Sequence, residues 1–271
     1  MIKSMFKLYE QPHLDNPSFL VGWNEDAGKL SPKVIEYLNR NIKSKSLCEI
    51  EPADFFSMGG VTIENDVAQF PEGKFFCSET HNLVIFKGSE PQFEKYRFLN
   101  AILDAAEHHY KAKELLTING TISPVAHTDT RKILAVFTQQ EFKKELQGCG
   151  LEYMTWEGPP ATSSYLLWLA KERAIPGVSL WPEIPFYLAA LEDFDAIKLT
   201  LRFLDDRFSL GLDLKELDEA IRVQDSRIAR LREENPDINR YIGMLEGGLS
   251  LSEEEQVELT KAVNEAIATR S

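Results

Sequence analysis

Residues 158–187, GPPATSSYLLWLAKERAIPGVSLWPEIPFY, decide the fold because a turn, a helix and a buried strand follow one another in close order. The two prolines after Gly158 cannot continue a helix, whereas Ser163 or Ser164 can cap the helix that follows. We therefore predict a helix that starts at Ser164 and ends at the next proline-glycine pair. Residues 178–181 then form a buried strand, so the stretch is half of a parallel crossover unit.

The same alternation of apolar runs and helical patterns extends back to the start of the chain. Strands are expected at residues 19–22, 47–50, 83–86, 115–118 and 134–137, and helices from Ser31, over 91–110 and from a capping box at Thr138 to just before Gly148. Asn65 and Asp66 predict a hairpin between 61–63 and 67–70, with 75–77 as a third antiparallel piece. Trp168 and Trp181 are expected in the core. The order predicts a three-layer α/β fold, a mainly parallel sheet with helices on both faces.

Beyond Trp181 the pattern contains helices without strands, which predicts an α/β core domain over 1–190 and a helical extension over 191–271. Its helices carry apolar stripes, and the sequence does not show which surface packs against them. Its expected contact residues, for a second copy or a partner, are Leu214, Leu217, Ile221, Ile228, Leu231, Leu259 and Val263. Gln224 interrupts the near-heptad spacing, and two heptads are too few to establish a coiled coil. The alternative is that these helices pack on their own subunit.

Composition narrows the class of protein and its partners. The 271 residues carry a net charge of -13, which repels phosphate backbones and anionic lipids, so neither nucleic acid nor a membrane surface is expected as a partner. Cys48, Cys77 and Cys149 are widely spaced and form no Cys-x-x-Cys pair, so neither a disulfide framework nor a zinc site is predicted. No apolar run approaches membrane-spanning length, and a soluble protein of the reducing cytoplasm is expected.

Few residues point to chemistry. Asp26 and Gly28 follow the first core strand, where open α/β sheets bind ligands, but no glycine-rich phosphate loop is present and no cofactor is predicted. His127 next to Asp129, together with Glu183 near the end of the last strand, could complete a ligand crevice. No partner nucleophile is identifiable, so no catalytic residue is assigned. The alternatives are structural turns and loop contacts for all five residues.

Several short motifs, spread in order over the chain, resemble one known family. They are Gly22-Trp23 with Asp26-Ala27-Gly28, Pro52-x-Asp54-Phe55-Phe56, Asn119-Gly120 followed by Pro124-x-x-His127-Thr128, Gly158-Pro159-Pro160 with two serines, and Glu234-Asn235-Pro236. In order and spacing the chain is similar to the proteasome assembly chaperone 2 family, particularly its bacterial members. The resemblance implies a phosphorylase/hydrolase-like α/β fold with a C-terminal helical extension, and homo-oligomers that are trimers among bacterial forms.

Some relatives in that family act as assembly chaperones or binding partners of the 20S proteasome, and some dock through a hydrophobic-Tyr-x tail. This chain ends in Ala268-Thr269-Arg270-Ser271, which puts docking through the tail in doubt. We predict a non-enzymatic, cytoplasmic, homo-oligomeric protein-interaction or assembly-chaperone-like module, with a trimer favoured. The alternative is a small-molecule-binding protein, or a hydrolase- or phosphorylase-like enzyme, that uses a crevice at the carboxyl ends of the strands.

Overall fold

The computed structural model describes residues 5–9, 12–57, 62–64, 66–155, 157–158 and 160–268. The chain forms two compact units. Unit 1 comprises residues Met1–Glu25, Ser31–Asn119 and Ala135–Leu180, and unit 2 comprises Asp26–Leu30, Gly120–Leu134 and Trp181–Ser271. The domain boundary expected after residue 190 lies inside unit 2.

Within the described residues, ten strands form one sheet in the order β1-β3-β6-β7-β2-β8-β12-β10-β11, with β9 paired to β12 outside this path. Their bounds are β1 Phe6–Leu8, β2 Ser18–Trp23, β3 Lys45–Ile50, β6 Gly73–Ser78, β7 Leu83–Gly88, β8 Glu114–Ile118, β9 Thr121–Ser123, β10 Ile133–Phe137, β11 Leu151–Tyr153 and β12 Gly177–Pro185. β2 runs parallel to β7 and β8, and β12 runs parallel to β8 and β9. The predicted mainly parallel α/β sheet is confirmed.

The predicted β excursion at one edge of the sheet is also present. β6 pairs antiparallel with β3 and β7, and β1 pairs antiparallel with β3. A separate hairpin joins β4 (Thr62–Glu64) to β5 (Val67–Gln69). Val61 and Asn65, which the hairpin prediction also used, lie outside the described residues.

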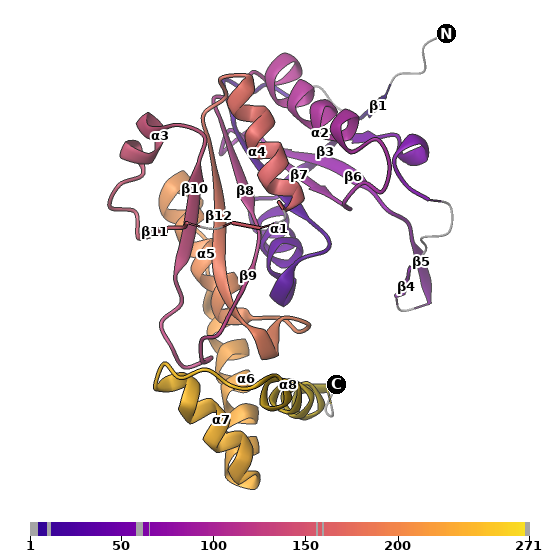
Figure 1. Cartoon of the computed structure of the whole chain (residues 1–271). Helices are drawn as coiled ribbons and strands as arrows, with labels where there is room; N and C mark the ends of the chain where they lie inside the picture. The colour runs from indigo at the N-terminus through magenta and orange to yellow at the C-terminus, as the bar shows by residue number, and fades with distance from the viewer. Residues whose placement is uncertain are drawn as a thin grey trace. The chain divides into compact units, whose positions relative to one another are not determined.

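Helices cover both faces of the sheet in unit 1. α2 (Lys95–Asp104) and α4 (Thr162–Glu172) lie side by side on one face (Figure 1). α1 (Leu30–Asn41) covers the other face, where a Cβ on Gly22 of β2 would come within 2.5 Å of Ile35. A π-helical turn over Ala105–His109 follows α2, and α3 (Gln140–Glu145) is short. The three layers match the prediction.

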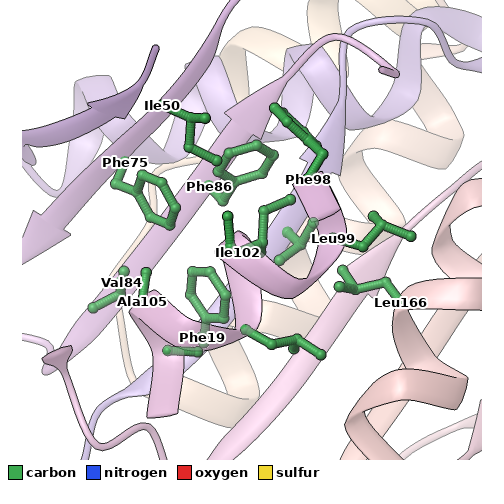
Figure 2. Packing of buried hydrophobic residues seen from close by; sticks show 14 of the residues in the cluster. Phe19, Ile50, Phe75, Val84, Phe86, Phe98, Leu99, Ile102, Ala105 and Leu166 are labelled. Atoms are coloured by element: carbon green, nitrogen blue, oxygen red, sulfur yellow. The ribbon is translucent and has the colours of Figure 1, made fainter. Parts of the chain in front are cut away.

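The core of unit 1 is an aromatic cluster between the sheet and α2. Phe86 of β7 contacts Phe75 of β6 edge-on, with ring centroids 4.9 Å apart, and Phe98 of α2 at 6.1 Å. Figure 2 shows these rings with Phe19, and with Leu166 of α4 beyond them. Phe19, Phe75, Phe86 and Phe98 have no exposed surface. Because a fully buried side chain of this size contributes about 1.5–3 kcal/mol, this cluster is a main source of stability.

Three local predictions from the sequence are wrong. α4 begins at Thr162 after Ala161, without a side-chain cap. Ser163 instead accepts a hydrogen bond of 2.8 Å from the indole of Trp23, a buried donor that needs a partner. Thr138 caps no helix either, because its hydroxyl accepts the backbone N–H of Gly177. Trp168 lies on the outer side of α4 and is 49% exposed. Pro159 lies outside the described residues.

Unit 2 contains β9, the second half of β12 and the C-terminal helices. A 3-10 turn over Ala27–Lys29 precedes α1, and another, Phe186–Leu188, follows β12. The helices are α5 (Phe194–Phe208), α6 (Lys215–Glu234), α7 (Pro236–Glu246) and α8 (Glu253–Ala268). α6, α7 and α8 pack against one another, and α8 also packs on the turn after β12 (Figure 1).

Candidate functional site

The loop of residues 120–134 begins at a turn that Asp26 holds in place. One oxygen of Asp26, Oδ1, accepts the backbone N–H groups of Ala27 at 3.0 Å and Gly120 at 2.8 Å. Gly28 adopts φ 63°, donates to the carbonyl of Ala189 and accepts the N–H of Asp193. The carboxylate and the glycine therefore form a tightly packed turn, in the way that Asp and Gly commonly do.

His127 lies farther along the same loop, against a buried tyrosine. Its backbone N–H donates to Tyr187 Oη at 2.6 Å, and its Nδ1 lies 2.9 Å from the same oxygen. Tyr187 Oη therefore holds both the backbone and the imidazole ring of His127. Burial, with Arg131 and Arg232 nearby, lowers the pKa of His127 to about 4. The ring is therefore neutral at physiological pH.

Beside His127 lies a buried ion pair between Arg131 and Asp193. Their side chains are 2% and 1% exposed, and Arg131 Nε is 3.4 Å from Asp193 Oδ2. Arg131 also donates to the carbonyls of Ala126 at 2.7 Å and Asp129 at 3.2 Å, while Asp193 Oδ1 caps α5 through the N–H of Ala196. Burial raises the pKa of Asp193, and Arg131 opposes this rise. The pair joins the loop to the start of α5.

These residues line a groove with a volume of ≈ 540 Å³. Its wall comes from the loop, the start of α5 and one face of α6, and we call it the α5–α6 groove. It is lined by His127, Thr128, Asp129, Thr130, Arg131, Leu188, Asp193, Asp195, Lys198, Leu199, Arg202, Ile221, Gln224 and Asp225. Polar and charged side chains therefore predominate, with three aliphatic ones among them.

The five residues expected in a crevice have separate roles in the structure. His127 and Asp129 line the α5–α6 groove, and Asp129 Oδ2 accepts the N–H of Ala126 at 2.8 Å. Asp26, Gly28 and Glu183 do not contribute to its wall. Glu183 is part of β12, where it pairs with Thr121 of β9 and donates its backbone N–H to Lys132. The structure thus brings together two of the five residues.

Of the contact residues expected in the C-terminal helices, four are covered by the chain itself. Leu217 is 7% exposed, and Ile228, Leu259 and Val263 have no exposed surface. Leu214, Ile221 and Leu231 of the α6 region are half-buried. The near-heptad stripe of α6 therefore divides into a buried side and a side that retains accessible surface. The side-chain amide of Gln224 donates a hydrogen bond to the carbonyl of Glu192. This bond explains why a polar residue occurs in the otherwise apolar stripe.

Two kinds of feature have no counterpart among the described residues. No group of three or more His, Cys, Asp or Glu side chains is placed to hold a metal ion there. Among the helices of the same residues, none combines the length and apolar character needed to traverse a bilayer.

Comparison with known proteins places the chain in a family. The model of the PAC2 family matches residues 19–232. The chain belongs to the PAC2 family. The resemblance to the proteasome assembly chaperone 2 family is confirmed, and the matched part extends from β2 into α6. No curated protein matches the chain.

Solved structures of PAC2-type proteins share its fold. PbaB, an archaeal proteasome activator from Pyrococcus furiosus, has a TM-score of 0.68 and 23% identity, covering 84% of this chain and 98% of its own. A PAC2 family protein from Streptomyces avermitilis has a TM-score of 0.71 and 20% identity, with 83% and 99% covered. A proteasome-assembly chaperone homologue from Mycobacterium tuberculosis has a TM-score of 0.69 and 17% identity, also with 83% and 99% covered.

Sequence patterns did not identify the ion pair or most of the groove in this PAC2 chain. Arg131 lies in a stretch that resembles any polar loop, and Tyr187 comes two residues after Pro185 without a motif around it. Asp193 did carry a signal, since it directly precedes α5 and an aspartate at the start of a helix is a common cap. The pairing of Arg131 with Asp193 depends on residues 62 positions apart, which spacing alone does not reveal.

The low pKa of His127 predicts a pH dependence of stability. The unfolded chain binds a proton at this imidazole near pH 6.5, whereas the folded chain does so only near pH 4. As pH falls from 6.5 to about 4, the free energy of unfolding therefore decreases by up to about 1.4 kcal/mol per pH unit. Denaturant titrations should show this slope, and His127→Gln should reduce it. An NMR titration that placed the pKa of His127 near 6.5 would contradict the prediction.

Proposed function

We propose that this PAC2 protein is a non-enzymatic protein-interaction module with an assembly-chaperone-like role. The observation that carries the proposal is the family match over residues 19–232, which includes both the α/β core and the start of the helical extension. Two proteins of the same fold are described as an archaeal proteasome activator and a proteasome-assembly chaperone homologue. Both descriptions name the proteasome or its assembly.

The arrangement of polar residues supports a non-enzymatic role. Asp26 Oδ1 is bonded to two backbone N–H groups, and Glu183 lies outside the groove that His127 lines. Tyr187 bonds both the backbone and Nδ1 of His127. General acid-base catalysis requires such groups to converge on one reacting atom. In this structure the hydrogen bonds of Asp26 and Tyr187 instead hold the loop of residues 120–134 in place.

The proposed working form is a homo-oligomer, with a trimer favoured, in the cytoplasm. The three cysteines, Cys48, Cys77 and Cys149, are free thiols, which suits a reducing compartment. Three half-buried residues are proposed as part of the contact between copies or with a partner: Leu214, which directly precedes α6, and Ile221 and Leu231 of α6. Residues 269–271 lie outside the described part of the chain.

Light scattering of the full-length protein after size-exclusion chromatography tests this proposal. A trimer gives three times the chain mass of 30.9 kDa, and this mass should persist on dilution into the low micromolar range. Urea below the unfolding transition serves as a control, because it should lower the mass before circular dichroism changes. A mass equal to one chain at every concentration would refute self-association.

A further inference from the structure

The first turn of α4 lacks the cap that its sequence predicts. Ala161, the residue before the helix, has the extended backbone of a capping residue, with φ -74° and ψ 162°, but no side chain caps the helix. The hydroxyl of Ser163 is engaged by the indole of Trp23. Within the described residues, the backbone N–H groups of Thr162 and Ser163 consequently have no acceptor. Helix ends satisfy such N–H groups through a side chain, water or a ligand.

A second, independent observation is the unpartnered hydroxyl of Thr162. The residue is only 8% exposed, and its hydroxyl makes no hydrogen bond within the described residues. This hydroxyl is not one of the fully enclosed side-chain atoms without a partner there, so its remaining accessible surface opens on the small pocket that Thr162 lines. Buried polar groups in folded proteins are normally satisfied, and one that is not often marks a position for water, an ion or a ligand.

The pocket lies between the N-terminal halves of α2 and α4, and we call it the α2–α4 pocket. It has a volume of ≈ 90 Å³. This is about three times the share of liquid volume that one water molecule occupies, so the pocket admits a group of phosphate size but not a nucleotide. The rings of Tyr96 and Tyr165 are in edge-to-face contact beside it, with centroids 5.8 Å apart. It is lined by Lys95, Tyr96, Leu99, Pro160, Thr162 and Tyr165.

The charge of the lining selects an anion. Among the described residues, no carboxylate lines the pocket, and the ammonium group of Lys95, which does, has no ion-pair partner. The N-terminus of a helix carries a partial positive charge, and its N–H groups point at an anion placed there. The chain as a whole is acidic. Salt screens charges beyond about 8 Å at physiological ionic strength, however, so the donors in the pocket dominate the interaction.

We propose that the α2–α4 pocket binds a single phosphate group. The N–H groups of Thr162 and Ser163 and the hydroxyl of Thr162 donate hydrogen bonds to its oxygens, and the ammonium group of Lys95 neutralises part of its charge. A phosphate group has enough acceptor oxygens for these donors at once. Inorganic phosphate and the phosphorylated side chain of a protein partner share this chemistry. The inference is independent of the oligomeric state and of the proposed chaperone-like role.

Phosphorus NMR of the full-length protein in chloride buffer tests the proposal. The resonance of inorganic phosphate, or of an acetylated, amidated Gly-phosphoserine-Gly peptide, should broaden saturably with one site per chain. Sulfate, which is also a tetrahedral dianion, should displace the bound phosphate, whereas the unphosphorylated peptide should not. Tighter binding of the phosphopeptide would identify a phosphorylated side chain as the source, and tighter binding of inorganic phosphate would identify the free anion. Absence of saturable binding by both probes would overturn the proposal.

Variants locate the site. Thr162→Val should weaken binding about tenfold, because it removes a hydrogen bond to a charged group while the side chain keeps its shape. Lys95→Met should weaken binding about threefold, since the lysine side chain is exposed and its charge is screened. Lys171→Met is the matched control, because it removes an exposed lysine of α4 that does not line the pocket, and it should leave affinity unchanged.

Ala161→Asp distinguishes an anion site from an ordinary helix end. Its carboxylate should cap α4 in place of the ligand, because aspartate is a favoured capping residue and the backbone conformation is suitable. The variant should therefore melt at a higher temperature and bind phosphate at least about tenfold more weakly. Thermal melts of all variants establish that they fold. Unchanged binding by Ala161→Asp, or equal binding by Thr162→Val and the wild type, would overturn the proposal.

Discussion

Replacing Arg131 with methionine should lower the free energy of unfolding by about 3–5 kcal/mol, because the change leaves a buried carboxylate without its counter-ion. Asp193 is 1% exposed and its Oδ2 accepts no hydrogen bond within the described residues, so little else can compensate its charge. The carbonyls of Ala126 and Asp129 lose their donor as well. Urea titration followed by circular dichroism measures the loss.

A double-mutant cycle separates the ion pair from the other contacts of Arg131. Asp193→Asn should retain the cap of α5, because asparagine also accepts an N–H at this position. In the background of Asp193→Asn, Arg131→Met should therefore cost clearly less than it does alone. Strict additivity of the two changes would show that the ion pair has no energetic role.

The pH dependence of the Arg131→Met variant provides a further check. Burial already raises the pKa of Asp193, and loss of Arg131 removes the charge that opposes this rise. A carboxyl whose folded pKa lies above its unfolded value loses stability as pH increases through the folded pKa. The deficit of the variant should consequently be smaller near about pH 4 than near about pH 7. A deficit that grows on acidification would contradict this assignment.

Phe86→Ala should cost about 3–5 kcal/mol, because it empties the middle of the aromatic cluster in unit 1. Phe86 has no exposed surface and contacts Phe75 and Phe98 edge-on (Figure 2). It also contacts Trp23 edge-on. Phe70→Ala is the control, since Phe70 is 68% exposed and its loss should change stability by less than about 0.5 kcal/mol. Similar losses for both variants in urea titrations would refute the importance of this cluster.

The sequence predicted most of the fold because apolar runs of strand length mark buried strands directly. The strand expected at 19–22 is β2, Ser18–Trp23, and that expected at 83–86 is β7, Leu83–Gly88. Caps were predicted less well. Ser163 and Thr138 have the right residue type for a cap, but each bonds a group from a distant segment. Tertiary contacts of this kind leave no local pattern.

The candidate site was predicted only in part for the same reason. His127 and Asp129 were singled out by residue type and do line the groove, whereas Asp26 accepts the backbone N–H of Ala27 in its own turn and that of the distant Gly120. Arg131 and Asp193 form the buried pair through folding of the loop onto α5. Periodicity shows which helix faces are apolar, but it does not show that Leu259 and Val263 are covered within the chain.

Self-association is the central claim about function, and native mass spectrometry of the full-length protein tests it most directly. The account predicts a dominant species of three chains, each of 30.9 kDa, that releases single chains only on collisional activation. A spectrum that contained single chains alone, under conditions in which circular dichroism shows the protein to be folded, would contradict it.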